Sequence, residues 1–192
     1  MSGRDAETKS RLHRQSLIEA TLSDPALPGL VHGMVQLAEW TPRWAELFAE
    51  EAERLRSALG DLAVGIEHYG STSVPGLVAK PLLDILVGGP DATDPVPYIT
   101  ALTPLGYDYA AGAGVPEHLV FGRGSARTHL VHVVRYGGAA WQRGLRFRDA
   151  LRADATLRDA YAALKRELAE RYGTDRTRYT AEKAAFIERS MA

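Results

Sequence analysis

The chain has 192 residues, with 23 basic and 24 acidic side chains and a formal net charge of −1. Hydrophobic residues make up 45% of it and charged residues 24%, a composition typical of globular and not of disordered proteins. The absence of cysteine excludes disulfides, zinc–thiolate sites, iron–sulfur clusters and cysteine nucleophiles. A chain of this length buries enough surface to fold without a structural metal.

The charge is unevenly distributed along the chain. Residues 141–192 carry a net charge of +4, whereas residues 1–140 carry −5. Either solvated helix faces or an anionic ligand held between the two parts would explain this asymmetry. The near-neutral total gives no strong attraction to nucleic acid, so we expect no nucleic-acid partner. Because we find neither an apolar run of ~20 residues nor a signal peptide, we expect a soluble cytoplasmic protein without a membrane partner.

The first elements in chain order are an arm, a strand and a helix. Residues 1–30 are mostly polar and predict an N-terminal arm that ends near Pro28. Residues 34–37 predict a short strand. A helix should begin at Thr41-Pro42 and end near Gly60, because threonine is a good N-cap and proline is tolerated in the first turn.

The middle of the chain predicts a sheet and the end predicts helices. We expect a short helix over residues 98–102 and strands over residues 64–69, 82–87, 107–110, 118–121 and 128–136. From residue 139 the pattern is helical, with Asp154 and Thr180 as the N-caps of two helices. The fold class is therefore α/β (α+β): residues 31–192 should form one domain, with a sheet core over about 31–136 and a helical tail over about 139–192.

Asp84 is the most informative single residue, because it interrupts an otherwise apolar interior strand. An ionised carboxylate in such a place costs several kcal/mol unless something pairs with it. A metal ion, a basic side chain or backbone donors could be the partner, and a cap at the strand end is the alternative. Lys80 lies four residues earlier, which we expect to be too far along a strand to face Asp84 directly.

The loop Gly70-Ser71-Thr72-Ser73 follows a predicted strand and is expected to open a helix. Small residues with free N–H groups at such a junction can form an anion-binding nest, to which the three hydroxyl groups would add donors. The alternative is a loop that only caps the helix. The phosphate-binding pattern GxxxxGK[ST] is absent from the sequence.

Histidines offer a second group of candidates. His129 and His132 are three residues apart in a predicted strand, so they should point to opposite faces and cannot bind one metal ion together. His132 is either a hydrogen-bonded core histidine or a ligand of the site. Glu67 and His68 also alternate, so only one of them can face the site.

Two segments carry a resemblance to a known family. The sequence IEHYGSTSVPGL at 66–77, followed by AKPLLDILV at 79–87, is similar to the GrpB family, a branch of the nucleotidyltransferase superfamily. The stretches RTHLVHVV at 127–134, LRFRD at 145–149 and YTAEKAAFI at 179–187 continue the resemblance. It implies a nucleotidyltransferase-like mixed sheet flanked by helices. In that superfamily two carboxylates hold two Mg²⁺ ions, but here Leu86 occupies the second acidic position.

The resemblance implies an enzyme that transfers a nucleoside monophosphate from an NTP, ATP above all, to a small-molecule acceptor, or that adenylates a carboxylate for ligation. Asp84 and Glu67 would bind Mg²⁺, with His132 as a third catalytic residue. The phosphates would be bound by Gly70, Ser71, Thr72, Ser73, Lys80, Arg127 and Lys183, and the substrate by Arg146 and Arg148. One alternative is a nucleotide- or anion-binding module that lost catalysis with the second carboxylate. Another is a scaffold with a vestigial pocket.

Overall fold

The computed structural model describes residues 24–30, 33–113 and 115–191. Its centre is one five-stranded sheet with the order β1-β2-β5-β4-β3. The strands are β1 (Gly65–Tyr69), β2 (Leu83–Gly89), β3 (Tyr107–Tyr109), β4 (Leu119–Arg123) and β5 (His129–Arg135). β2 and β5 are parallel, and the other neighbours are antiparallel. The mixed sheet expected from the sequence is therefore confirmed.

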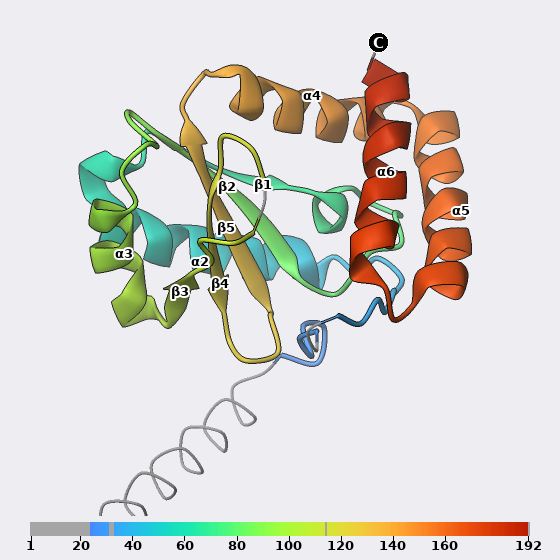
Figure 1. Ribbon diagram of the computed structural model, residues 1–192, viewed down its shortest axis with the longest axis horizontal. Helices are drawn as coiled ribbons and strands as arrows, with labels where there is room; N and C mark the ends of the chain where they lie inside the picture. The colour runs from blue at the N-terminus through green and yellow to red at the C-terminus, as the bar shows by residue number, and fades with distance from the viewer. Residues whose placement is uncertain (1–23, 31–32, 114, 192) are drawn as a thin grey trace, which may run out of the picture.

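Five α-helices surround the sheet in the described part of the chain. They are α2 (Arg43–Leu59), α3 (Val96–Leu102), α4 (Ala139–Ala153), α5 (Ala155–Tyr172) and α6 (Arg176–Met191). Short 3₁₀ turns span Gly60–Leu62, Ser71–Ser73 and Thr103–Leu105. In Figure 1, α5 and α6 stand side by side at one end of the sheet and α3 lies at the other end. The predicted helical tail thus consists of three helices.

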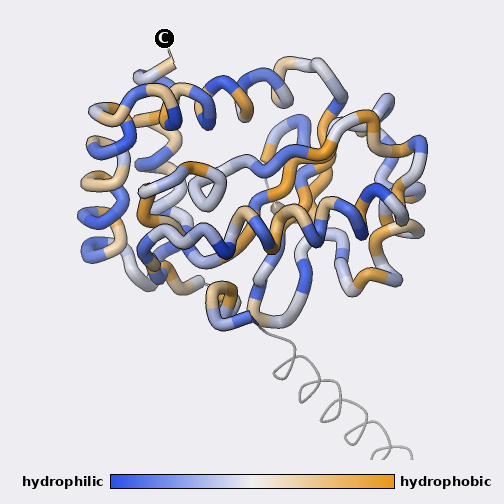
Figure 2. Tube along the Cα trace, turned by 180° about the vertical axis from the view of Figure 1, so that it is seen from behind, coloured by the Kyte–Doolittle hydropathy of each residue, from blue (hydrophilic) through white to orange (hydrophobic). Residues whose placement is uncertain are grey.

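The two faces of the sheet are covered by different helices. Ile85 and Val131 belong to the largest apolar core, which packs against α2 through residues such as Trp44 and Leu55. On the other face, Leu86 packs against α4 through a smaller cluster that includes Trp141. Figure 2 shows the apolar residues concentrated along the central strands. Because side chains alternate along a strand, Asp84 lies on the second face, with Leu86.

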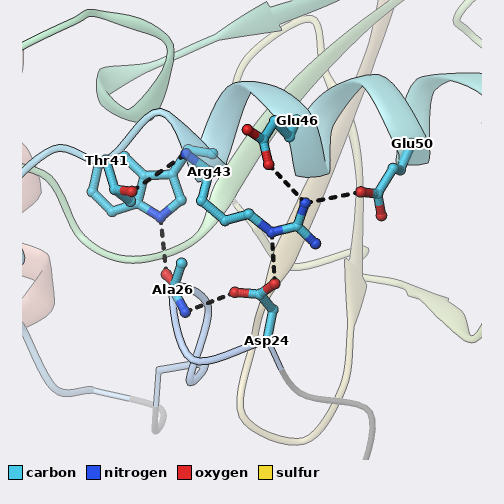
Figure 3. Close-up of polar contacts among 7 residues, drawn as sticks. Asp24, Ala26, Thr41, Arg43, Glu46 and Glu50 are labelled. Atoms are coloured by element: carbon cyan, nitrogen blue, oxygen red, sulfur yellow. Dashed lines mark hydrogen bonds and ion pairs between the residues drawn. The ribbon is translucent and has the colours of Figure 1, made fainter.

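Residues 24–30, the last part of the predicted arm, pack against α2. Leu27 is 2% exposed, and the indole of Trp44 donates a hydrogen bond to the carbonyl of Ala26 at 2.9 Å. Figure 3 shows Arg43, the first residue of α2, bonded to the carboxylates of Asp24, Glu46 and Glu50. The helix begins at Arg43 with Pro42 as its N-cap residue, one position later than predicted, and the Thr41 hydroxyl accepts the Arg43 N–H at 3.3 Å. Residues 1–23 of the predicted arm lie outside the described residues.

The strand predicted over residues 34–37 is wrong. The segment has no strand, and the Val35 N–H donates to the carbonyl of Gly173 at 2.8 Å. Ala38 forms a single isolated bridge with Ala79. The apolar side chain of Val35 is buried against Leu168 and other residues of the helical tail. The apolar pattern at 34–37 therefore reflects packing against helices and not pairing in a sheet.

Of the two caps expected for the last two helices, one is confirmed and the other is wrong. Asp154 is confirmed, because its carboxylate accepts the N–H groups of Thr156 and Leu157 at 2.8 and 3.1 Å. The last helix begins at Arg176, five residues earlier than a cap at Thr180 predicts, so Thr180 lies inside it. Asp175 takes the capping role by accepting the Arg178 N–H at 3.1 Å.

Candidate functional site

Asp84 meets the end of β1 at close range. It is paired with Tyr69 on β1 and with Leu130 on β5. Gly70 follows directly with φ at +71°, and a Cβ there would lie 2.5 Å from Oδ2 of Asp84. Only glycine combines this backbone angle with so close an approach. The structure thus places Gly70-Ser71 beside the Asp84 strand, the arrangement that the resemblance implied.

The loop after Gly70 is tighter than predicted. Instead of opening an α-helix it forms one 3₁₀ turn of three residues, so it offers no helix dipole. The Ser73 hydroxyl donates to the carbonyl of Gly70 at 2.6 Å, and the Thr72 hydroxyl lies 3.0 Å from Nε2 of His68. Thr72 and Ser73 therefore hold the shape of the loop with their hydroxyl groups, and Gly70-Ser71 is the part beside Asp84.

Four basic side chains surround Asp84. Burial raises the pKa of this carboxyl group, while the positive charges of Lys80, Lys183, Arg176 and Lys165 lower it. Among the described residues the one basic group within 4 Å of the carboxylate is His132, whose Nε2 is 3.9 Å away. The Asp84 side chain is 28% exposed, so solvent reaches it. We call Asp84 and these four lysine and arginine residues the Asp84 cluster.

Lys80 does not contact Asp84 directly, in line with the sequence analysis, since among the described residues His132 is the one basic group within 4 Å of the carboxylate. The charge of Lys80 acts on Asp84 more strongly than the other three. The chain bends just before β2, since the Leu82 N–H donates to the carbonyl of Lys80 at 2.8 Å. Lys80 is therefore outside the extended strand, and spacing along a strand does not apply to it.

The lysines of the cluster are held among tyrosine rings. Nζ of Lys183 lies 4.9 Å from the ring centroid of Tyr179, and Nζ of Lys165 lies 4.8 Å from that of Tyr161. Lys165 is 1% exposed and donates to the carbonyl of Val78. Burial lowers the pKa of Lys183 to about 7 and that of Lys165 to about 6. The favourable charge that acts on both ammonium groups is Asp84.

The carboxylates present do not fit a pair of Mg²⁺ ions. Glu67 shares a face with Asp84, but its Oε2 accepts a hydrogen bond from Arg148 at 2.7 Å. Leu86, at the second acidic position of the superfamily, is fully buried among apolar residues. Residues 24–30, 33–113 and 115–191 contain no group of three histidine or acidic side chains placed to hold a metal. Asp84 thus has cations around it where a second carboxylate would be needed.

The predicted arginines lie elsewhere. Arg127 sits over Gly122 and pairs with Asp108, which neutralises its charge. Arg146 is exposed on α4. Arg148 joins α4 to β1, since it donates to Glu67 and, at 3.1 Å, to the carbonyl of His68. The structure brings none of these three into the Asp84 cluster.

Sequence reasoning missed Lys165 and Arg176. One signal for Lys165 was available, because it falls four residues after Tyr161 and three before Leu168 on the apolar stripe of α5. A lysine inside such a stripe is almost never buried without a polar role. Arg176 gives no comparable signal, since it is exposed in the first turn of α6.

The histidines divide between the two faces as predicted. His129 lies on the α2 face, where Nη2 of Arg123 approaches its ring at 2.9 Å. His132 borders Asp84 on the other face, and its Nδ1 lies 3.2 Å from Nδ1 of His118. His118 comes from the loop before β4, and no sequence pattern predicted that it would lie beside His132. The row Asp84–His132–His118 leads from the cluster towards that loop.

Four of these histidines predict a pH-dependent stability. Burial lowers the pKa of His68 and His129 to about 3 and that of His118 and His132 to about 4. Between pH 6.5 and these values the unfolded chain binds more protons, so the free energy of unfolding should fall as the pH falls. We expect a loss of at least about 2 kcal/mol between pH 7 and pH 5, measured by urea unfolding.

The variant His118→Gln provides the control for this prediction. It removes one of the four titrating groups at the edge of the fold and should reduce the loss between pH 7 and pH 5. A free energy of unfolding that is constant over this range would show that the histidines are not kept neutral in the folded state.

Comparison with known proteins identifies the family of the chain. Residues 34–192 match the family model described as GrpB protein. The chain belongs to the GrpB family. It is 41% identical to UPF0157 protein BH1888 of Halalkalibacterium halodurans over 160 residues, which are 82% of this chain and 80% of that protein. It is 33% identical to the glutamate-rich protein GrpB of Alkalihalophilus pseudofirmus, over 83% of this chain and 95% of that one.

A solved structure of the family has the same fold. GrpB from Enterococcus faecalis superimposes with a TM-score of 0.70 at 28% identity, over 82% of this chain and all of that chain. Cid1 in complex with its short product ApU is more distant, with a TM-score of 0.49 and 16% identity over 69% of this chain and 43% of that one. In the described part of this GrpB protein, no helix has the length and apolar character to cross a membrane.

Proposed function

We propose that this GrpB protein binds the phosphate groups of a nucleotide at the Asp84 cluster. The observation that carries the proposal is the convergence of Lys80, Lys183 and Arg176 on a single carboxylate that none of them touches within 4 Å. Burial makes the charges of the Lys80 and Lys183 ammonium groups unfavourable, since neither has a carboxylate of the described residues within 4 Å. An anion with several oxygens relieves this cost, because each ammonium group gains a charge-assisted hydrogen bond.

A nucleotide as the ligand is supported by the resemblance to the nucleotidyltransferase superfamily, and ATP is the nucleotide that we propose to test first. The nucleotidyltransferase superfamily, which the GrpB sequence pattern resembles, places phosphates at Gly-Ser after a strand. Gly70-Ser71 lies beside Asp84 here in the same relation. The cations of the cluster would neutralise the phosphate charge, a task that a pair of Mg²⁺ ions performs where two carboxylates are present.

Thermal unfolding with and without ATP tests this proposal. At ten times its dissociation constant, ATP should stabilise the protein by about 1.4 kcal/mol. For a chain of this size, such a change raises Tm by ~3–5 °C. We expect the same rise in EDTA as in Mg²⁺, since the cluster supplies the positive charge itself. No shift at 10 mM ATP in either buffer would contradict the proposal.

A second candidate function is transfer of the nucleoside monophosphate to a small acceptor, or adenylation of a carboxylate. It is favoured by Asp84 and His132, whose carboxylate and Nε2 are 3.9 Å apart beside the cations. In the transfer, the acceptor oxygen bonds to the α-phosphorus, pyrophosphate leaves, and Asp84 takes the acceptor proton. Pyrophosphate release from ATP in the presence of hydroxyl and carboxyl compounds distinguishes this enzyme from a module that only binds.

A further inference from the structure

A cavity of about 340 Å³ lies at the β1 edge of the sheet, within the size range of small-molecule sites. Its lining includes His68. Tyr69 is paired with Asp84 and shares its face of the sheet, so His68, the residue before Tyr69 on β1, points to the opposite face. The other principal lining residues are Trp40, Thr72, Ser73, Arg152 and Arg158. No member of the Asp84 cluster lines this cavity, which we call the loop cavity.

Arg152 brings to the loop cavity a positive charge that is only partly compensated. Its Nε and Nη2 both donate to the carbonyl of Ser73, at 3.1 and 2.7 Å. A carbonyl carries no net charge, so these bonds hold the guanidinium in place without neutralising it. The nearby carboxylate of Asp149 is 3.9 Å from Nη1 of Arg152 and is already bonded to Arg148 at 2.7 Å.

Arg158 adds a second guanidinium from α5. Its Nε donates to Asp159 at 3.0 Å, and that carboxylate is 70% exposed outside the cavity. The lining therefore contains two arginines and no acidic side chain. His68 adds no third charge, since burial lowers its pKa to about 3 and its ring stacks on Phe48 at 4.7 Å.

Trp40 gives the loop cavity a fixed aromatic surface. Its indole Nε1 donates to the carbonyl of Thr72 at 3.2 Å, which sets the orientation of the ring. An aromatic ring that is already oriented stacks on a flat ligand with little further loss of freedom. Backbone carbonyls of Thr72 and Ser73 thus position both an aromatic face and a guanidinium beside the same space.

We propose that the loop cavity is a binding site for a phosphate monoester carried on a flat ring, with the phosphate at Arg152 and Arg158 and the ring on Trp40. Two guanidinium groups match the charge of a phosphate monoester, which is close to −2 at pH 7, better than that of a single carboxylate. This site is separate from the Asp84 cluster and does not rest on the nucleotide proposed there.

Tryptophan fluorescence tests the proposal at the site itself. Trp40 is half-buried, whereas Trp44 and Trp141 are 1% and 8% exposed, so a ligand in the cavity should change the emission of Trp40. AMP is the probe. Adenosine and inorganic phosphate, which correspond to the two halves of AMP, are tested separately for comparison. We expect AMP to change the emission with saturation, and each half to bind at least about ten times more weakly.

Variants separate the loop cavity from the Asp84 cluster. Arg152→Gln and Arg158→Gln should each weaken AMP binding about tenfold, whereas Arg146→Gln, exposed on α4, should leave it unchanged. Because Arg152 also holds the loop, Arg158→Gln is the variant that keeps the test valid if Arg152→Gln misfolds. Lys183→Met should leave the Trp40 signal unchanged. Unaltered emission at 10 mM AMP, or loss of the signal in Lys183→Met alone, would overturn the proposal.

Discussion

Replacing Lys183 by methionine is expected to weaken ATP binding about tenfold and to raise the stability of the protein at the same time. The ammonium group would otherwise contact phosphate oxygens, and one charge-assisted hydrogen bond contributes about 1.5–3 kcal/mol. Burial lowers the pKa of Lys183 to about 7, so the charge is unfavourable in the free protein. Methionine has a similar length without the charge and should add at least about 1 kcal/mol to the free energy of unfolding.

Calorimetric titration with ATP and urea unfolding measure the two effects on the same variant. Arg189→Gln is the matched control, because Arg189 is an exposed cation on the same helix and its loss should change neither quantity. A Lys183→Met variant that binds ATP as tightly as the wild-type protein would exclude Lys183 from the phosphate site. Loss of stability together with binding would indicate a structural role.

Asp84→Asn decides between a metal site and a cationic phosphate site. A metal ligand that is lost should abolish Mg²⁺-dependent ATP binding. In the Asp84 cluster the carboxylate repels phosphate and shields the lysines, so its removal should tighten ATP binding several-fold. Calorimetry in EDTA and in Mg²⁺ distinguishes the two results. Turnover, where pyrophosphate release shows it, should nevertheless fall in this variant, because the proton acceptor is gone.

The second large effect is expected at Glu51, on the other face of the sheet. Its side chain is 3% exposed and accepts hydrogen bonds from Tyr107 at 2.9 Å and from Arg123 at 2.7 Å. Arg123 in turn contacts His129, so Glu51 holds a buried network between α2, β3, β4 and β5. Glu51→Ala should cost about 3–4 kcal/mol, because it leaves the Arg123 charge without its partner.

Urea unfolding measures this loss, and Glu53→Ala on the same helix is its control. Glu53 is 78% exposed and pairs with Arg56 at the surface, so its removal should change stability by less than about 0.5 kcal/mol. A Glu51→Ala variant within 1 kcal/mol of wild type would mean that Arg123 finds water or another partner. ATP binding at the Asp84 cluster should be retained in the variant, since the network faces away from it.

Local pattern was enough to predict the sheet and most helices. The apolar run before and after Asp84 identified β2, and the 3.6-residue spacing identified α2. The segment at 34–37 shows where such reasoning fails, since Val35 is buried by a helix pair far away in the sequence. The caps show the same limit, because Asp175 and Thr180 are both suitable residues and only the packing of α6 selects Asp175.

The candidate site was only half predictable. Gly70-Ser71, Asp84, Lys80, His132 and Lys183 were all named from the sequence. Glu67 and Arg127 were expected to join them. Instead, Glu67 is paired with Arg148 and Arg127 is paired with Asp108. An ionic partner that lies 81 residues away, as Arg148 does from Glu67, leaves no periodic trace in the sequence. The charge of each residue therefore indicated which residues could belong to the site. It did not indicate the ionic partner of each residue.

The sequence by itself determined the family, the strand that carries Asp84 and the glycine that lets the loop approach it. These features depend on residues that are close together in the chain, where sterics and side-chain alternation act directly. The tertiary structure alone decided that Lys165 and Arg176 join Lys80 and Lys183 around one carboxylate. It also decided that Trp40 and Arg152, which are far apart in the chain, line the loop cavity. Both depend on how α4, α5 and α6 pack against the sheet, and that packing is fixed by apolar contacts between distant segments.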